Sequence, residues 1–189
     1  SKYFAVLLDQ DNTVARNGTS TYTAMEHYWD ESFGYYGAAR DYARYSDEQL
    51  AGKSADDFTF DSNGDGQIDL KSEYNFGLSR NAGKRDKGGS GVDFTKEIFD
   101  AYLAGRTAIT NQGTVAEISV HRQIAAEGME KVIAATAVHY INDTLGDMSK
   151  IGTADEHAAN HNKHWAEMKA FTMALQYNTF GKLTAADLE

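Results

Sequence analysis

Residues 61–73 read DSNGDGQIDLKSE and place oxygen-bearing side chains at alternate positions. Ca²⁺ takes about six to eight oxygen ligands, so side chains that alternate along a turning loop can converge on one ion. The side chains that can do so are Asp61, Asn63, Asp65 and Asp69, and Gln67 can add its backbone carbonyl. The spacing therefore predicts a calcium site in this segment.

The segment resembles the calcium loops of EF-hands and dockerins, with Asp61 at position 1, Gly66 at the turning position 6 and Ile68 at the apolar position 8. The acid usual at position 12 is replaced by Ser72, and Glu73 follows one residue later. Either Glu73 reaches the ion through a shifted turn, or the site lacks this ligand and binds weakly. The alternative to a calcium site is an acidic surface loop that merely turns.

Histidines and carboxylates at helical spacing form a second candidate group. His27 is followed three and four residues later by Asp30 and Glu31, and His164 is followed by Glu167. Imidazole and carboxylate together suit zinc or iron. We expect His27 to point into the protein towards the helix that bears His164 and Glu167, where a second metal site can form. A polar contact without metal is the alternative reading.

The elements that must position these residues are expected to be helices, because apolar residues recur at three- and four-residue spacing and the chain has no proline. We expect one helix from a Thr19-Ser20 cap to about Tyr45, and a second from Phe94 to a turn at Gly113. A third should run from Thr114 to about Met148, and the last should follow a cap at Thr153.

These helices predict an all-α fold, a helical bundle in a single domain of residues 1–189. Residues 46–92 read as a polar, glycine-bearing insertion that contains the calcium loop. Trp29 and Trp165 are expected to close one core. The stripe expected to be buried on the third helix consists of Val115, Ile118, Ile124, Met129, Ile133, Ala137, Ile141 and Leu145.

The composition excludes several kinds of partner and chemistry. Asp and Glu number 28 against 18 Lys and Arg, a net charge of -10, so nucleic acid is not an expected partner. The chain has no cysteine, which excludes thiolate ligands and a cysteine nucleophile. No run is apolar enough for a membrane span, and no signal peptide or hydrolase motif is found. We expect the chain to be part of a longer protein.

Residues 22–35, 69–77 and 164–171 together resemble an uncharacterised bacterial family related to imelysins. The resemblance implies a helical bundle of the periplasm or outer membrane, often a lipoprotein, associated with iron uptake and once classed as a metallopeptidase. The imelysin motif Gly-x-His-x-x-Glu is partly matched around His27. Met25 stands at the glycine position, Asp30 at the glutamate position, and Glu31 one residue later.

The preferred interpretation is a calcium-stabilised, non-enzymatic domain of the bacterial envelope that is periplasmic, outer-membrane-associated or secreted and serves iron or another metal. Its expected partners are metal ions and an unknown small molecule or protein. One alternative is a metallopeptidase that uses His27 and Glu31, with ligands from His164 and Glu167. The other is a structural or adhesive module that retains calcium.

Overall fold

The computed structural model describes residues 2–89, 91–178 and 185–187, and its described residues are all-α, as the sequence predicted. Among them, extended pairing is limited to isolated bridges between Ala15 and Thr23 and between Thr59 and Tyr74. The helices are α1 (Lys2–Val6), α2 (Ala24–Tyr36), α3 (Asp47–Ala51), α4 (Ala55–Phe58), α5 (Leu78–Lys87), α6 (Phe94–Thr110), α7 (Val115–Met148) and α8 (Ala158–Leu175). Short 3₁₀ turns occupy Leu7–Asp9, Arg16–Gly18, Tyr42–Arg44 and Ala185–Asp187.

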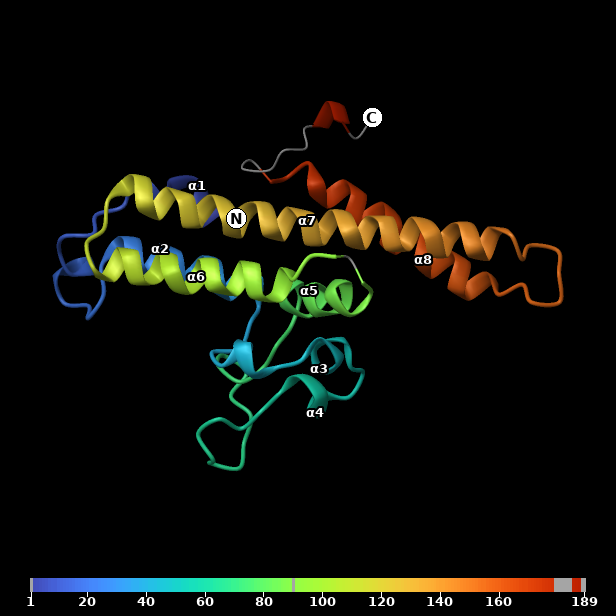
Figure 1. Cartoon of the computed structure of the whole chain (residues 1–189), viewed down its shortest axis with the longest axis horizontal. Coiled ribbons are helices and arrows are strands. Elements are labelled where there is room, and N and C mark those ends of the chain that lie inside the picture. The colour runs from blue at the N-terminus through green and yellow to red at the C-terminus, as the bar shows by residue number, and fades with distance from the viewer. Residues whose placement is uncertain (1, 90, 179–184, 188–189) are drawn as a thin grey trace.

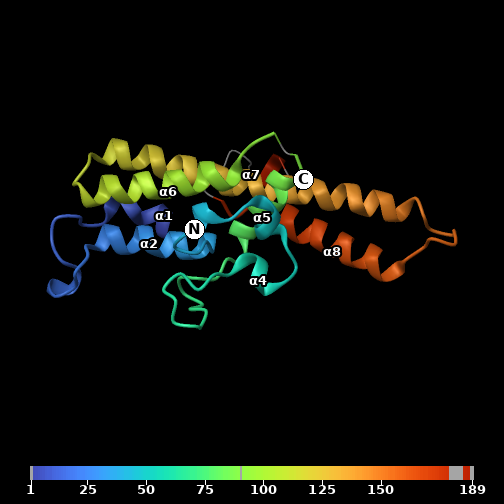
Figure 2. The same ribbon diagram turned by 60° about the horizontal axis from the view of Figure 1, so that its bottom comes forward.

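The long helix α7 is the axis of the molecule (Figure 1). Helices α1, α2 and α6 lie along its N-terminal half, and α8 lies along its C-terminal half, an arrangement that both views show (Figure 2). Helices α3 and α4 and the acidic loop project from one side of this bundle. No helix of the described part of the chain is long and apolar enough to cross a membrane.

Local signals explain where α2 begins and ends. The Glu26 N–H donates to Thr23 Oγ1 at 3.2 Å, and the Thr23 N–H donates to Glu26 Oε2 at 2.8 Å, which is a capping box. The helix ends at Gly37, whose φ of 84° places it in the left-handed region. The predictions of a Thr19-Ser20 cap and of a helix to about Tyr45 are therefore wrong.

The bounds of α6 and α7 agree with the prediction, whereas the start of α8 does not. Thr114 caps α7, because its hydroxyl accepts the Glu117 N–H at 3.2 Å. Helix α8 begins at Ala158, and its cap is His157, whose ring accepts the Asn160 N–H at 3.3 Å. The predicted cap at Thr153 is wrong.

The core is built from α1, α2, α3, α5, α6 and α7, and its aromatic residues come mainly from α1, α2 and α6. Trp29 donates its indole N–H to the Tyr102 carbonyl at 3.0 Å, and Tyr102 donates its hydroxyl to the Ser32 carbonyl at 3.0 Å. Trp29 is 1% exposed, but Trp165 is 47% exposed on α8. The two tryptophans do not share a core, so that expectation is wrong.

The stripe predicted for α7 is buried only in part. Val115 and Leu145 are more than half exposed, whereas Ile118 and Ala137 are buried. Because α7 meets α6 along one half and α8 along the other, its contact face changes along its length. Small residues fill much of this contact face. One of them is Gly128, where an added Cβ would lie 2.5 Å from Ile98 Cγ1.

The predicted insertion contains a helix that belongs to the bundle. Helix α5 contacts α3, α6 and α7, and the Tyr42 hydroxyl donates to the Ser79 carbonyl at 2.6 Å. The part that projects from the bundle precedes α5 and includes α3, α4 and the acidic loop. Ser90, in the glycine-rich stretch after α5, lies outside the described residues.

Candidate metal centre

The acidic loop is shaped by backbone N–H groups that point at its own side chains. The Asp61 carboxylate accepts the N–H groups of Gly64 at 2.6 Å and Gly66 at 2.7 Å. Both glycines have left-handed φ angles, 75° and 81°, which residues with a side chain rarely adopt. Gly66 therefore supplies the turn predicted for position 6.

The side chains at the next two alternating positions fold inward in the same way. Asn63 Oδ1 accepts the Asp65 N–H at 2.8 Å, and Asp65 Oδ1 accepts the Gln67 N–H at 2.8 Å. The Asn63 amide also donates to Asp65 Oδ2 at 3.2 Å. The loop thus holds the side chains of Asp61, Asn63 and Asp65 within one compact turn.

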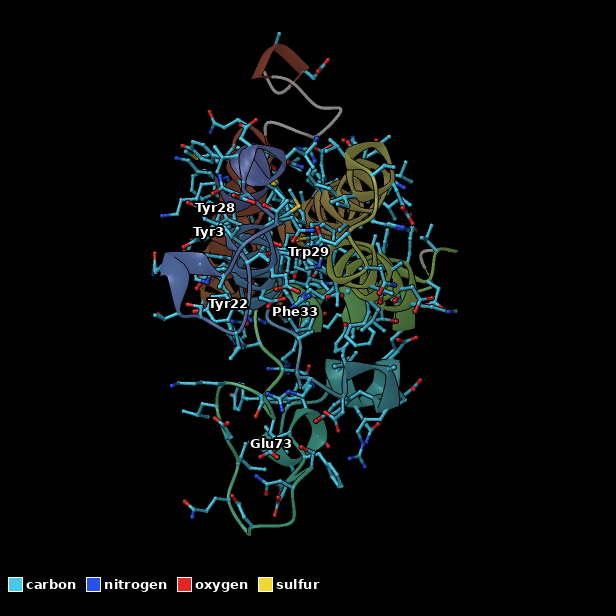
Figure 3. The ribbon with its side chains drawn as sticks, turned by 90° about the vertical axis from the view of Figure 1, so that its left-hand side faces the viewer. Tyr3, Tyr22, Tyr28, Trp29, Phe33 and Glu73 are labelled. Atoms are coloured by element: carbon cyan, nitrogen blue, oxygen red, sulfur yellow. The ribbon has the colours of Figure 1, made fainter. Side chains whose placement is uncertain are left out.

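Glu73 ties the two ends of the loop together. Its Oε1 accepts the Ser62 N–H at 2.9 Å, the Ser62 hydroxyl at 2.7 Å and the Asn63 N–H at 3.3 Å, and its Oε2 accepts the Asp69 N–H at 2.9 Å. The Asp69 N–H and the Ser62 hydroxyl lower the pKa of Glu73, so it stays ionised. Figure 3 shows Glu73 in the part of the molecule that projects from the bundle.

Asp69 is held at the exit of the loop. Its carboxylate accepts the Lys71 N–H at 2.9 Å and the Ser72 hydroxyl at 2.9 Å, and these bonds lower its pKa. Ser72, which occupies the position usual for the last calcium ligand, therefore serves as a donor to Asp69. The acceptor at the end of the loop is Glu73, one residue later.

Within the described residues, no ion pair involves Asp61, Asp65, Asp69 or Glu73. No group of three or more His, Asp or Glu side chains in that part of the chain is placed to hold a metal ion unaided. A calcium site here would therefore need neutral oxygens as well, from the Asn63 side chain, the Gln67 carbonyl and water. These neutral ligands are the ones that the sequence pattern supplies.

His27 lies on α2 among tyrosines. Its Nε2 is 3.9 Å from Glu31 Oε1, and its ring stacks on Tyr22 with the centroids 5.9 Å apart. Asp30, three residues on, pairs with Arg106 of α6 at 2.9 Å. Figure 3 shows Tyr22 and Tyr28 together on this side of the bundle.

His164 lies on α8 and takes its partners from α7. Its Nδ1 is 2.8 Å from Asp147 Oδ2, and its Nε2 is 3.9 Å from Asp143 Oδ2. Helices α2 and α8 lie along opposite halves of α7 (Figures 1 and 2), so His27 does not meet His164 or Glu167. The prediction that His27 points towards His164 and Glu167 is therefore wrong. Asp143 and Asp147 stand four residues apart on α7, and this spacing was the signal for the carboxylates that His164 meets.

A family model described as "Domain of unknown function (DUF4856)" matches residues 6–179, and the chain belongs to this family. No curated protein and no solved structure gives a significant match. The resemblance to imelysins stays a prediction.

Proposed function

We propose that this chain is a calcium-binding, non-enzymatic domain of the bacterial envelope. The observation that carries the calcium proposal is the acidic loop, in which backbone N–H groups position the Asp61 and Asp65 carboxylates and no cation pairs with them among the described residues. The resemblance to imelysins supports the envelope location, and through it a role in the supply of iron or another metal.

The ligands in this proposal are the side chains of Asp61, Asn63 and Asp65, the Gln67 carbonyl, and Asp69 directly or through water. Glu73 Oε2 accepts one hydrogen bond, which leaves it a lone pair for the ion. A divalent cation would offset the mutual repulsion of these carboxylates, against which the segment itself offers only Lys71.

Two facts favour a binding role over a metallopeptidase. The zinc ligands proposed for such an enzyme, His27 and His164, lie on helices at opposite halves of α7 and have separate carboxylate partners. The carboxylate at the glutamate position of the imelysin motif, Asp30, is bound by Arg106 at 2.9 Å. The proposal therefore assigns no catalytic residue.

The test is thermal unfolding with calcium and with a chelator. An ion that binds only the folded chain at about 100 times its Kd adds about 2.7 kcal/mol, which for a chain of this size raises Tm by about 5–10 °C. Asp65→Ala should lose most of this response, and Asp155→Ala, in the exposed turn before α8, should keep it. Elemental analysis should find calcium bound to the wild type and none to Asp65→Ala. Equal melting temperatures in calcium and in chelator would contradict the proposal.

A further inference from the structure

A cleft of about 580 Å³ separates α2 from the chain that leaves the acidic loop. Its apolar wall consists of Phe33, Leu70, Tyr74 and Phe76, and we call it the α2 cleft. Figure 3 shows Phe33 on the side of the bundle nearer Glu73. A volume of this size lies within the range that small organic ligands occupy.

Hydrogen bonds between the two walls fix the α2 cleft in place. The Arg40 N–H donates to the Ser72 carbonyl at 2.8 Å, and the Phe76 N–H donates to the Gly37 carbonyl at 2.9 Å. A Cβ on Gly37 would lie 2.3 Å from the Phe76 carbonyl oxygen, so the walls meet closely at one end. The cleft is therefore a built feature of the fold, because its walls cannot separate without breaking these bonds.

Gly34 lines the α2 cleft from the interior of α2, where glycine weakens a helix. Two other helical glycines have a packing reason, since a Cβ on Gly105 would lie 2.2 Å from Trp29 and one on Gly128 would lie 2.5 Å from Ile98. A Cβ on Gly34 would meet no atom within 4 Å. Packing within the chain does not explain Gly34, and its missing side chain leaves room for a ligand in the cleft.

The unpaired charges at the α2 cleft are positive. Among the described residues, the side chains of Arg40 and Lys71 make no ion pair, while Asp30 is bound by Arg106. The nearest loop acid in sequence, Asp69, is engaged by the Lys71 N–H and the Ser72 hydroxyl. Lys71 also acts on Asp69 through space, but neither cation is in an ion pair among the described residues. In a chain of net charge -10, two such cations beside an aromatic wall are complementary to an anion with an apolar body.

We propose that the α2 cleft binds a small aromatic carboxylate. The ring lies against Phe33, Tyr74 and Phe76 above Gly34, where the missing side chain leaves room for it. The carboxylate is held by Arg40, whose planar guanidinium matches a carboxylate in two hydrogen bonds, and by Lys71. The proposal does not depend on calcium in the acidic loop, because neither the lining of the cleft nor the hydrogen bonds between its walls involve the proposed calcium ligands.

Three probes that share a phenyl ring on a three-carbon chain and differ in charge test the chemical class of the ligand. 3-Phenylpropionate, 3-phenylpropionamide and 3-phenylpropylamine are titrated against the ¹⁵N-labelled chain at constant calcium concentration. We expect saturable amide shifts with the anion, confined to residues 30–40 and 70–76. The neutral amide should bind about tenfold more weakly and the amine not at all. No saturation by the anion below about 10 mM, or equal affinity of the three probes, would overturn the proposal.

Two pairs of variants test the site. Gly34→Leu fills the cleft and should weaken binding of 3-phenylpropionate at least tenfold, with Tm unchanged or raised, because leucine favours the helix. Gly146→Leu, at an exposed helical glycine of α7 that also meets no atom within 4 Å, should bind as the wild type does. Arg40→Gln should weaken binding about tenfold, while Lys53→Gln, at an exposed site outside the cleft, should not. Unchanged binding by Gly34→Leu would reject the site.

Discussion

Glu73 is 1% exposed and yet ionised, because four donors at the two ends of the acidic loop point at its oxygens. One side chain thereby joins the two ends of the loop, beside the backbone bond from the Phe60 N–H to the Glu73 carbonyl at 3.3 Å. These hydrogen bonds hold the shape of the loop, and we expect any ion to meet side chains that are already positioned.

Glu73→Gln tests this role. A glutamine amide nitrogen cannot accept a hydrogen bond, so at least one of the N–H groups of Ser62, Asn63 and Asp69 loses its acceptor. We expect Tm to fall by about 5 °C in calcium-free buffer, and calcium affinity to fall as well. Calorimetric unfolding and a calcium titration measure the two effects. Glu48→Gln, an exposed acid on α3, is the control, and a similar loss there would show that Glu73 has no special role.

At the residue scale, the sequence predicted where the acidic loop turns, but it did not predict the hydrogen-bond partners of the loop side chains. Gly66 and the alternating oxygens determine a local turn, so their spacing was enough to indicate positions 61–69. The four donors to Glu73 come from residues four to eleven positions away, and the pairing of His164 with Asp147 depends on how α8 packs against α7. The spacing of Asp143 and Asp147 indicates that they share a face of α7, but nothing in the sequence indicates which residue of α8 meets them.

At the scale of elements, glycine sets how closely the helices approach. Gly105 of α6 leaves room for the Trp29 ring of α2, and Trp29 is fixed by its hydrogen bond to the Tyr102 carbonyl. A residue larger than glycine at position 105 must therefore displace the Trp29 ring, which its hydrogen bond to the Tyr102 carbonyl holds in place. At Gly34, by contrast, an added Cβ would meet no atom within 4 Å.

Replacement of these two glycines by alanine should have opposite effects. Gly105→Ala places a methyl group 2.2 Å from Trp29 Cζ2 and 3.0 Å from His121 Cβ, so we expect a loss of about 1–3 kcal/mol in the free energy of unfolding. Gly34→Ala should gain about 0.5–1 kcal/mol, because alanine favours the helix and meets no neighbour. Urea unfolding measures both, and a gain in Gly105→Ala would contradict the packing described here.

The sequence predicted the bounds of α6 and α7 almost to the residue, because apolar residues recur along each helix and each begins at a side-chain cap, Asp93 and Thr114. It placed the end of α2 too late, because Gly37 stops the helix where it meets the Phe76 backbone. It missed α5 because the sequence LSRNAGKRDK is mostly polar and has few apolar residues, Leu78 and Ala82 among them. Burial of Ser79, Ala82 and Gly83 by neighbouring elements stabilises that helix.

At the scale of the whole molecule, two pairs of carboxylates with shifted pKa have opposite effects on stability. The N–H groups and hydroxyls that point at Asp69 and Glu73 lower the pKa of each. Asp47 and Asp86 lie between α3, α5 and the start of α6, and burial, with their mutual repulsion and that of Asp93, raises their pKa. Ionisation therefore stabilises the fold at the first pair and destabilises it at the second.

The opposite effects of these two pairs predict that the free energy of unfolding is greatest at mildly acidic pH in calcium-free buffer. As the pH falls from 7 through the raised pKa of Asp47 and Asp86, their protonation relieves the repulsion, and the free energy of unfolding should rise by less than about 1 kcal/mol after solvent screening. Below about pH 4 it should fall, because Asp69 and Glu73 bind protons more readily in the unfolded chain. Urea unfolding at half-unit steps from pH 3 to pH 8 measures the profile. Asp47→Asn should be more stable than the wild type at pH 7 and should show a smaller rise, and a wild-type profile that declines steadily from pH 7 to pH 5 would contradict this account.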